Sequence, residues 1–396
     1  MMCSTALVAN RTPVICGIGL SDYPIAPHLT TTQHHAQAMQ RALEDCGLPK
    51  ADLDGYVNAS SSATDMTVQM AEYLGIKHRY IDSTMTGGSS FEFHVQHAAA
   101  AIKDGVADAI LVTYGSDQLT RMGRMLGTGG FHSSDASVEG PGQFMSSYGI
   151  PLVGSYAMAA RRHMHEFGTT SEQLAEIAVG VREFAGFNPL ARYRDPISID
   201  DVLNSRVVAD PLHKLDCCVI TDGGGAFIMT TEERARDLKT PPVYVLGAAG
   251  TQTHWNIIQM PDFTEVGAAT AGPEALGRAG ITVDDIDVLQ LYDSFTITVL
   301  MMLEGLGFAG RGEGGALVQE GHFRKGGKWP MNTDGGGLSS NHPGMRGIFL
   351  IIESVRQLRG QAGTVQVPDC EIALACGSGG WLSCMGAVVM GKDRPS

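Results

Sequence analysis

Apolar residues follow two spacings along this chain, and the two alternate from one segment to the next. Residues 87–105 (GGSSFEFHVQHAAAAIKDG) begin with a glycine turn and continue at helical spacing, and the apolar run 107–116 (ADAILVTYGS) then predicts a buried strand. Residues 335–360 repeat this order and lead to a second predicted strand, 371–378 (EIALACGS). Alternating helices and strands of this kind predict an α/β fold in which helices cover parallel or mixed sheets.

A second pair of segments shows the same internal similarity. The stretches ALEDCGLPKADLDGYVNAS, from residue 42, and ALGRAGITVDDIDVLQLYDS, from residue 275, each predict a helix, a glycine stop, an Asp-x-Asp and an apolar strand. The matching residues are Ala42, Leu43, Gly47, Asp52 and Asp54 in the first stretch and Ala275, Leu276, Gly280, Asp285 and Asp287 in the second. We therefore expect two duplicated halves, 1–235 and 236–396, with a junction near Pro241-Pro242.

The first half carries extra sequence between about 118 and 210. This stretch is rich in Met and Gly, and its residues 155–185 repeat apolar positions at helical spacing. An insertion of this size in one half only is expected to cap a site.

Composition narrows the range of functions. The formal net charge of -14 and the lack of a basic run argue against nucleic-acid binding. No segment has the apolar length that a membrane span or a secretion signal needs, so we expect a cytoplasmic protein. The eight cysteines form no CxxC pair and predict neither a disulfide framework nor a metal site.

Two glycine turns are candidate anion sites. Gly87 and Gly88 precede the predicted helix of the first half, and Gly336 and Gly337 precede that of the second. The first N–H groups of a helix lack partners within the helix and stabilise negative charge, so paired helix starts can converge on one pocket. Tight packing of helix on sheet is the alternative explanation of each turn taken alone.

Four side chains in the second half are candidates for proton transfer. His342 precedes Pro343-Gly344 in NHPG, where imidazole suits proton transfer or oxyanion stabilisation near neutral pH. Tyr292 and Asp293 follow one predicted strand and Cys376 ends another, and the carboxyl ends of strands in α/β sheets tend to line the site. A Tyr292 of lowered pKa could exchange a proton and Cys376 could act as a thiolate or proton shuttle. A core tyrosine bonded to Asp293 and a buried structural thiol are the alternatives.

These residues lie in motifs that resemble the thiolase superfamily, and within it the thiolase-like enzymes of the sterol-carrier and lipid-transfer-protein type. The motifs are SYAMAARRHMHEFGTTSEQLAEIA (155–178), YDSFTITVLMMLEGLGF (292–308), NTDGGGLSSNHPG (332–344) and CGSGGW (376–381). The resemblance implies a duplicated five-layered αβαβα fold, a homodimer and an acyl-coenzyme A thioester as substrate, with no other cofactor. It also implies an activating and oxyanion-hole role for His342, an oxyanion-hole position at Tyr292, proton transfer to the substrate α-carbon by Cys376, and backbone N–H groups near the thioester at Gly379.

The chain departs from thiolases at one important position. Thr84 in DSTMTGGSS occupies the place of the nucleophilic cysteine, and a hydroxyl accepts an acyl group poorly unless a base activates it. Chains of this branch that lack the cysteine and carry YDxF resemble lipid-transfer-protein-type aldolases, which cleave β-hydroxyacyl-CoA side chains of steroids and act with a small partner that has an OB-fold and a zinc ribbon. Those aldolases have a second tyrosine beside the histidine, where this chain has Asn341.

The resemblance therefore predicts retro-aldol cleavage of a β-hydroxyacyl-CoA. Tyr292 would take the hydroxyl proton, His342 and nearby N–H groups would stabilise the enolate, and Cys376 or water would protonate it. We expect the partner to complete a heterotetramer, and we expect the glycine turns and Asn341 to contact the substrate. Two alternatives remain open. One is a divergent thiolase or acyltransferase that uses Cys376 or a Thr84 activated by His342, and the other is a noncatalytic subunit that binds acyl-CoA or lipid.

Overall fold

The computed structural model describes residues 11–59, 65–122, 143–144 and 148–394, and nine strands in these ranges form one mixed sheet. The strand order is β3-β2-β4-β7-β1-β8-β11-β10-β9. The strands are β1 (Pro13–Leu20), β2 (Gly55–Asn58), β3 (Tyr80–Asp82), β4 (Ala109–Ser116), β7 (Gly223–Thr231), β8 (Val243–Gln252), β9 (Val288–Leu291), β10 (Ile372–Gly379) and β11 (Cys384–Gly391). A separate small sheet pairs β5 (Val207–Ala209) with β6 (Leu212–His213).

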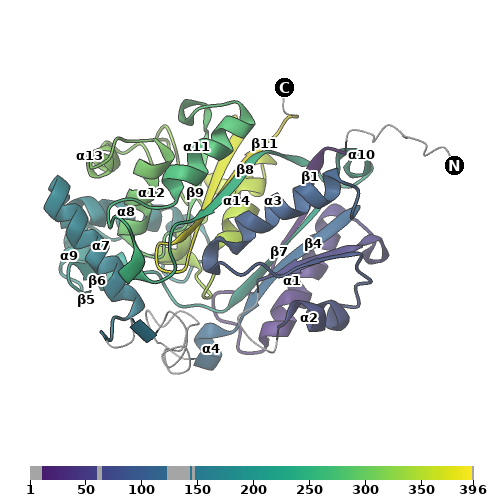
Figure 1. The fold of residues 1–396 in the computed structure, drawn as a ribbon, viewed down its shortest axis with the longest axis horizontal. Helices are drawn as coiled ribbons and strands as arrows, with labels where there is room; N and C mark the ends of the chain where they lie inside the picture. The colour runs from purple at the N-terminus through teal and green to yellow at the C-terminus, as the bar shows by residue number, and fades with distance from the viewer. Residues whose placement is uncertain (1–10, 60–64, 123–142, 145–147, 395–396) are drawn as a thin grey trace.

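Helices cover the two halves of the sheet and also separate them. They are α1 (Thr31–Cys46), α2 (Thr67–Leu74), α3 (Ser90–Lys103), α4 (Gln118–Met122), α7 (Leu152–Phe167), α8 (Ser171–Phe187), α9 (Ile199–Leu203), α10 (Glu232–Ala235), α11 (Ala268–Ala279), α12 (Thr296–Leu306), α13 (Gly314–Gln319) and α14 (Gly347–Leu358). In the middle of the molecule, α3 and α14 contact each other and strands from both halves (Figure 1). On the outside, α1 packs on β1, β4 and β7, and α11 packs on β8 and β11. The five layers αβαβα expected from the resemblance are therefore present.

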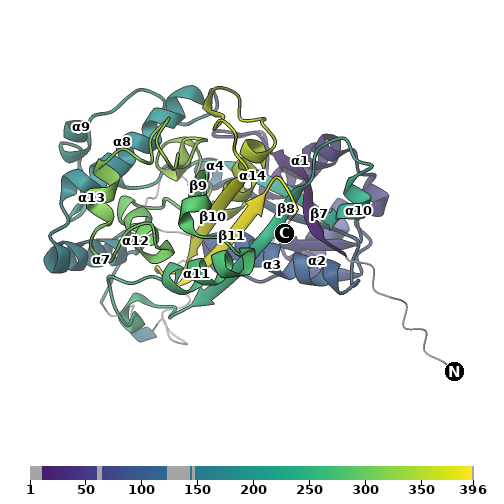
Figure 2. The same ribbon diagram turned by 90° about the horizontal axis from the view of Figure 1, so that it is seen from above.

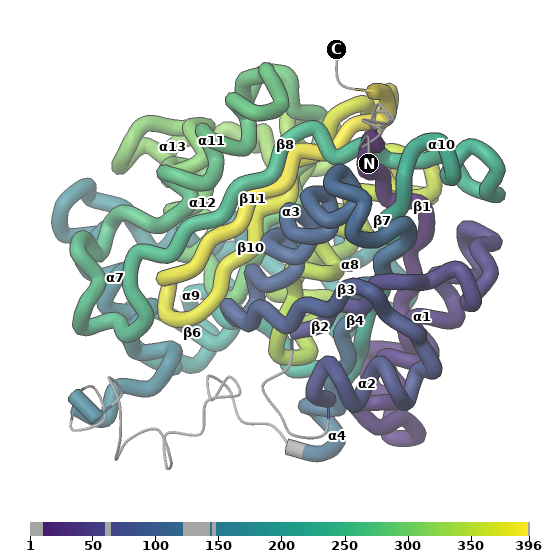
Figure 3. Tube along the Cα trace, turned by 45° about the vertical axis from the view of Figure 1, so that its right-hand side comes forward, coloured from purple at the N-terminus to yellow at the C-terminus, as the bar shows by residue number. Residues whose placement is uncertain are grey.

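The two halves of the sheet have equivalent strand orders when each is followed outward from the centre. From the central β1–β8 pair, the neighbours are β7, β4 and β2 on one side and β11, β10 and β9 on the other (Figure 3). The matched glycines Gly47 and Gly280 both end helices in the left-handed region, at φ 74° and 71°. The matched aspartates also act alike, because Asp54 accepts hydrogen bonds from the N–H groups that begin β4 and Asp287 accepts them from those that begin β10. The internal similarity is thus a structural repeat, while the boundary at 235/236 stays a prediction.

The predicted insertion forms a cluster of helices on one side of the molecule. There α7, α8 and α9 gather with α12 and α13 of the second half (Figure 2). Helix α8 packs on the turn Gly336–Ser340, so this part of the insertion covers elements of the predicted site. Residues 123–142 of the insertion lie outside the described residues. Within the described part of the chain, no helix is long and apolar enough to cross a membrane.

Candidate active site

The two central helices begin close together, although only α3 directly follows its predicted glycine turn. Helix α3 follows the turn Gly87–Ser89, and a Cβ placed on Gly347, the first residue of α14, would lie 2.3 Å from the carbonyl oxygen of Gly88. The helix of the second half, however, begins at Gly347 rather than after Gly335–Gly337. Those glycines lead into a separate helical turn, Gly336–Ser340, which is followed by the extended Asn341 and by His342.

Tyr292 and His342 meet beside these helix starts. The Tyr292 hydroxyl lies 3.0 Å from Nε2 of His342, and the two rings pack edge to face. The Tyr292 ring also packs on Gly88, where a Cβ would come within 2.2 Å of it. A second tyrosine holds the histidine turn, because the Tyr114 hydroxyl donates to the carbonyl of Pro343 and accepts from the N–H of Met345.

The surroundings of Tyr292 and His342 determine the protonation state of each side chain. Removal from water, and to a smaller extent the positive charge of Arg346, lower the pKa of His342 to about 4, so the imidazole is neutral near pH 7. Burial raises the pKa of Tyr292 well above its usual value, and negative charge at Cys218 adds to that effect. A lowered pKa, the condition named for proton exchange by Tyr292, is therefore not met. Tyr292 is therefore protonated, and its hydroxyl can donate to Nε2 of the neutral imidazole in the tautomer that carries its proton on Nδ1.

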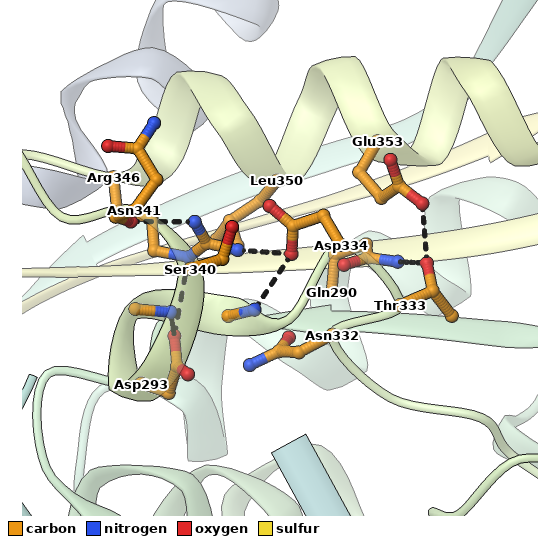
Figure 4. Close-up of polar contacts among 12 residues, drawn as sticks. Gln290, Asp293, Asn332, Thr333, Asp334, Ser340, Asn341, Arg346, Leu350 and Glu353 are labelled. Carbon is orange, nitrogen blue, oxygen red and sulfur yellow. Dashed lines mark hydrogen bonds and ion pairs between the residues drawn. The ribbon is translucent and has the colours of Figure 1, made fainter. Parts of the chain in front are cut away.

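Asp293 supports the site from behind. Its Oδ1 accepts from the N–H of Gly337 at 2.7 Å and its Oδ2 accepts from the N–H of Leu338 at 3.0 Å. The N–H of Gly336 is also occupied, since it donates to Oδ1 of Asp334 at 2.9 Å (Figure 4). These carboxylates already bind the N–H groups, so in this structure Asp293 supports the turn, while its predicted catalytic role and the predicted substrate contacts of Gly336 and Gly337 stay predictions.

Asn341 also binds protein rather than facing outward. It is buried, and its Oδ1 accepts from the hydroxyl of Thr221, which in turn accepts from the N–H of His342 at 3.0 Å. The arrangement orients His342. The prediction that Asn341 contacts substrate is not supported by this geometry.

Cys376 lies on the face of its strand opposite to the face that packs on α3. Successive strand residues point to opposite faces, and the next residue, Gly377, faces Glu92 of the central helix α3. The Cys376 thiol thus points away from the central layer, where Tyr292 packs on Gly88. It is fully buried, and burial raises its pKa above the usual thiol value. The structural-thiol alternative describes Cys376 better than a proton shuttle does.

Thr84 is bonded away from His342. Its hydroxyl and its backbone N–H both donate to Oδ1 of Asp82 at 2.9 Å, and Oδ2 of Asp82 binds Nδ1 of His97. A threonine activated by His342 is therefore not what the structure contains. The alternative that relied on it stays a prediction, with Asp82 rather than His342 as the partner of Thr84 in this structure.

Gly87, Gly88 and Gly379 allow the backbone to approach closely. A Cβ on Gly379 would overlap the carbonyl oxygen of Thr86, and one on Gly87, whose φ is 82°, would come within 2.9 Å of the Gly380 nitrogen. Close packing thus explains why glycine is needed at these positions. Contact of their N–H groups with a thioester stays a prediction.

The sequence interpretation missed the segment 217–222, which runs between the two catalytic motifs. The N–H of Cys218 donates to the carbonyl of Ser294 at 2.9 Å, and the N–H of Val219 donates to that of Gly337 at 2.8 Å. The Cys218 side chain is partly exposed and close enough to Tyr292 for a thiolate there to raise the tyrosine pKa. The Cys217-Cys218 pair, which Val219 and Ile220 separate from TDGGG, was the available signal.

Comparison with known proteins agrees with this geometry. Residues 249–392 match the family model described as Thiolase C-terminal domain-like. The chain is 32% identical over 390 residues to a steroid side-chain-cleaving aldolase from Thermomonospora curvata, which covers 96% of this chain and 98% of that protein. It is 34% identical over 357 residues to a 17-hydroxy-3-oxo-4-pregnene-20-carboxyl-CoA lyase from Mycobacterium tuberculosis, covering 87% and 91% of the two chains. A solved structure described as the Ltp2-ChsH2(DUF35) aldolase superposes with a TM-score of 0.87 at 30% identity, over 97% of this chain and 98% of that one.

The family model, the two relatives and the superposition all lead to one assignment, and they confirm the resemblance noted in the sequence motifs. The chain is an enzyme of the thiolase superfamily and belongs to its thiolase-like branch of sterol-carrier and lipid-transfer-protein type.

Proposed function

We propose that this enzyme cleaves the carbon–carbon bond between the α and β carbons of a β-hydroxyacyl-CoA by a retro-aldol reaction. The observation that carries the proposal is the Tyr292–His342 hydrogen bond of 3.0 Å in a site whose nucleophile position holds a threonine bonded to Asp82. A retro-aldol step needs a proton acceptor for the β-hydroxyl and a site for the enolate, but no acyl-enzyme. The two aldolase and lyase relatives support the same reaction class.

The proton leaves the substrate through the tyrosine. As the β-hydroxyl transfers its proton to the Tyr292 oxygen, Tyr292 passes its own proton to Nε2 of the neutral His342. The α–β bond then breaks, the β-carbon becomes a ketone or aldehyde carbonyl, and the electron pair moves into the thioester enolate. The relay explains how a tyrosine with a raised pKa can serve as the base.

The enolate must then receive a proton at its α-carbon. Cys376 faces away, and Cys218 is the thiol beside Tyr292, so we assign this step to Cys218. Burial raises the Cys218 pKa to about 12, which keeps the thiol protonated and still leaves it far more acidic than a thioester α-carbon. The proton held on His342 returns through Tyr292 to restore the thiol.

A thiolase reaction is the second candidate, because Cys218 is a partly exposed thiol near Tyr292. The same raised pKa argues against it, since the thiolate is the nucleophile and burial disfavours the thiolate. A subunit that only binds acyl-CoA or lipid is the third candidate, and it would not need the Tyr292–His342 pair.

The solved aldolase whose fold this chain shares pairs its thiolase-like chain with a DUF35 protein. We infer a similar assembly here, in which a homodimer of this chain binds two copies of a small partner with an OB-fold and a zinc ribbon. Coenzyme A would enter as part of the substrate, and the proposed reaction requires no other cofactor.

The test is to purify the chain with and without a DUF35 partner and incubate it with a panel of β-hydroxyacyl-CoA and β-ketoacyl-CoA esters. Mass spectrometry then follows the products with and without free CoA. The expected result is cleavage of hydroxy esters without added CoA, which yields a carbonyl compound and a shorter acyl-CoA. Cleavage of keto esters only, and only with CoA, would establish the thiolase instead. Tight binding with no turnover of any ester would leave the binding subunit.

A further inference from the structure

Among the residues that the structure describes, Arg346 has the largest fully buried side chain, and it lies between the segments that carry Tyr292 and His342. Its Nε is 3.3 Å from Oδ1 of Asp293, the residue after Tyr292. Its Nη1 donates at 2.9 Å to the carbonyl of Asn341, the residue before His342. One guanidinium group thus connects the direct neighbours of both members of the proton-transfer pair (Figure 4).

A third contact completes the arrangement. Nη2 of Arg346 donates at 2.5 Å to Oδ1 of Asp334, which also accepts from the N–H of Gly336. Burial works against the charge on Arg346, while Asp334 and Asp293 raise its pKa and keep it protonated. A planar guanidinium can reach three such acceptors at fixed angles, whereas the ammonium group of lysine has a different shape and reach.

The glycine motif leaves room for this group. A Cβ on Gly337 would lie 3.1 Å from Cδ of Arg346 and 3.0 Å from Oδ1 of Asp293. A Cβ on Gly336 would come within 2.1 Å of Oδ2 of Asp293. The glycines that the sequence analysis assigned to substrate binding therefore let the turn close around the ion network.

A buried charged network of this kind is costly if packing is its only purpose. Replacing buried ion pairs by apolar residues of similar volume is often neutral or stabilising, so stability alone does not account for Arg346. Its contacts instead fix the distance between the end of β9 and the histidine turn.

We propose that Arg346 is a positioning residue that holds Tyr292 and His342 at hydrogen-bond distance. The inference rests on the proposed function, because it specifies how the proposed proton-transfer pair is built. The positive charge adds to the effect of burial on the pKa of His342, so removing that charge moves the pKa upward.

The test compares three variants of the full chain. Arg346→Met removes the positive charge and all three contacts. Arg346→Lys keeps the positive charge but lacks the planar guanidinium that reaches the three acceptors. The matched control is Arg182→Met. Arg182 is also buried and donates to Oγ of Ser339 in the same turn at 2.7 Å, yet it touches neither Asp293 nor Asn341.

Two measurements separate positioning from general support. The first is an NMR titration of the labelled His342 imidazole, assigned with His342→Asn, which needs no substrate. The second is kcat and KM for a cleaved β-hydroxyacyl-CoA. Arg346→Met is expected to raise the His342 pKa and to lower kcat by about 100-fold with KM within about threefold of wild type, since misplacing a reacting group by about 1 Å costs this much.

Arg346→Lys is expected to lower kcat while the His342 titration stays near that of wild type, and Arg182→Met is expected to leave the titration unchanged. The proposal is overturned if Arg346→Lys has wild-type kcat, or if Arg182→Met shifts the titration as Arg346→Met does. Should Arg346→Met fail to fold, the kcat of Arg346→Lys and the His342 titration of Arg182→Met still test the proposal. If wild type cleaves no hydroxy ester, the proposed function fails while the titration still tests Arg346.

Discussion

At the scale of single residues, the hydroxyl of Tyr292 is the group on which the proposed chemistry depends. Tyr292→Phe keeps the ring that packs on Gly88 and removes only the oxygen 3.0 Å from His342. We expect retro-aldol kcat to fall at least about 100-fold, because general acid–base groups contribute this much or more. Steady-state kinetics with a β-hydroxyacyl-CoA measure the change. Near-normal turnover would remove Tyr292 from the mechanism.

The two candidate thiols provide a matched pair of substitutions. Cys218→Ala is expected to slow turnover by at least about tenfold through loss of the α-carbon proton donor, and to leave His342 titrating as before. Cys376→Ala, on the opposite face of β10, is expected to change kcat by less than about twofold because it touches no reacting group. The same kinetic assay checks both. A larger loss in Cys376→Ala than in Cys218→Ala would restore the original assignment.

Residue identity alone could predict the pair but not its supports. Tyr292 and His342 lie in motifs with a known chemical pattern, and the structure brings them together. The roles of Asp293 and Cys376 depend on which way each side chain points, and that direction is set by strand parity and by where the next turn closes. Cys218 was missed because its contact with the site comes from chain segments about 75 residues apart in sequence, at Ser294.

At the scale of elements, the start of α3 packs closely against the Tyr292 ring. A Cβ on Gly88 would meet the Tyr292 ring at 2.2 Å and the carbonyl oxygen of Ser378 at 2.4 Å. Gly88→Ala is therefore expected to displace the Tyr292 ring and to lower kcat. The same substitution is expected to lower the free energy of unfolding by about 1–3 kcal/mol.

The control for that substitution lies in α11. A Cβ on Gly277 would meet no atom within 4 Å, and the residue is exposed near the helix end. Gly277→Ala is expected to leave kcat unchanged and to stabilise the fold by up to about 1 kcal/mol, because alanine favours the helix. Denaturant unfolding of both variants checks the pair. Equal effects would mean that the Gly88 contact is not tight.

The elements themselves were largely predictable from spacing. The helix stops at Gly47 and Gly280 and the Asp-x-Asp repeats were confirmed, because each is encoded by local sequence. The start of α14 was wrong by about ten residues. A glycine triplet normally marks a turn before a helix, but here the turn closes on Asp293 and Asp334 from distant segments before the helix begins.

At the scale of the whole molecule, buried neutral histidines link stability to pH. Burial lowers the pKa of His94 and His342 from 6.5 to about 4, and that of His35 to about 3. In the unfolded chain the same groups take up protons near pH 6.5. Between these values the unfolded state binds more protons, so the free energy of unfolding falls as pH drops from about 6.5 towards about 4.

The expected loss is up to about 1.4 kcal/mol per histidine for each pH unit in that window. Urea unfolding at pH 7 and pH 5 measures it. His94→Gln keeps an N–H donor for the carbonyl of Thr84 and cannot titrate, so its stability is expected to fall less between the two pH values. An equal fall in wild type and variant would show that His94 is not part of the linkage.

The central strands β1 and β8 meet through only two residue pairs, Val14 with Tyr244 and Ile15 with Val243. The two halves on either side of this narrow seam carry different side chains near the site. A symmetric pair of separate chains would have to accept every substitution twice. One continuous chain has no such constraint, so Thr84 can bond to Asp82 in one half while Tyr292 bonds to His342 in the other. The seam thus joins two similar halves whose side chains can differ independently.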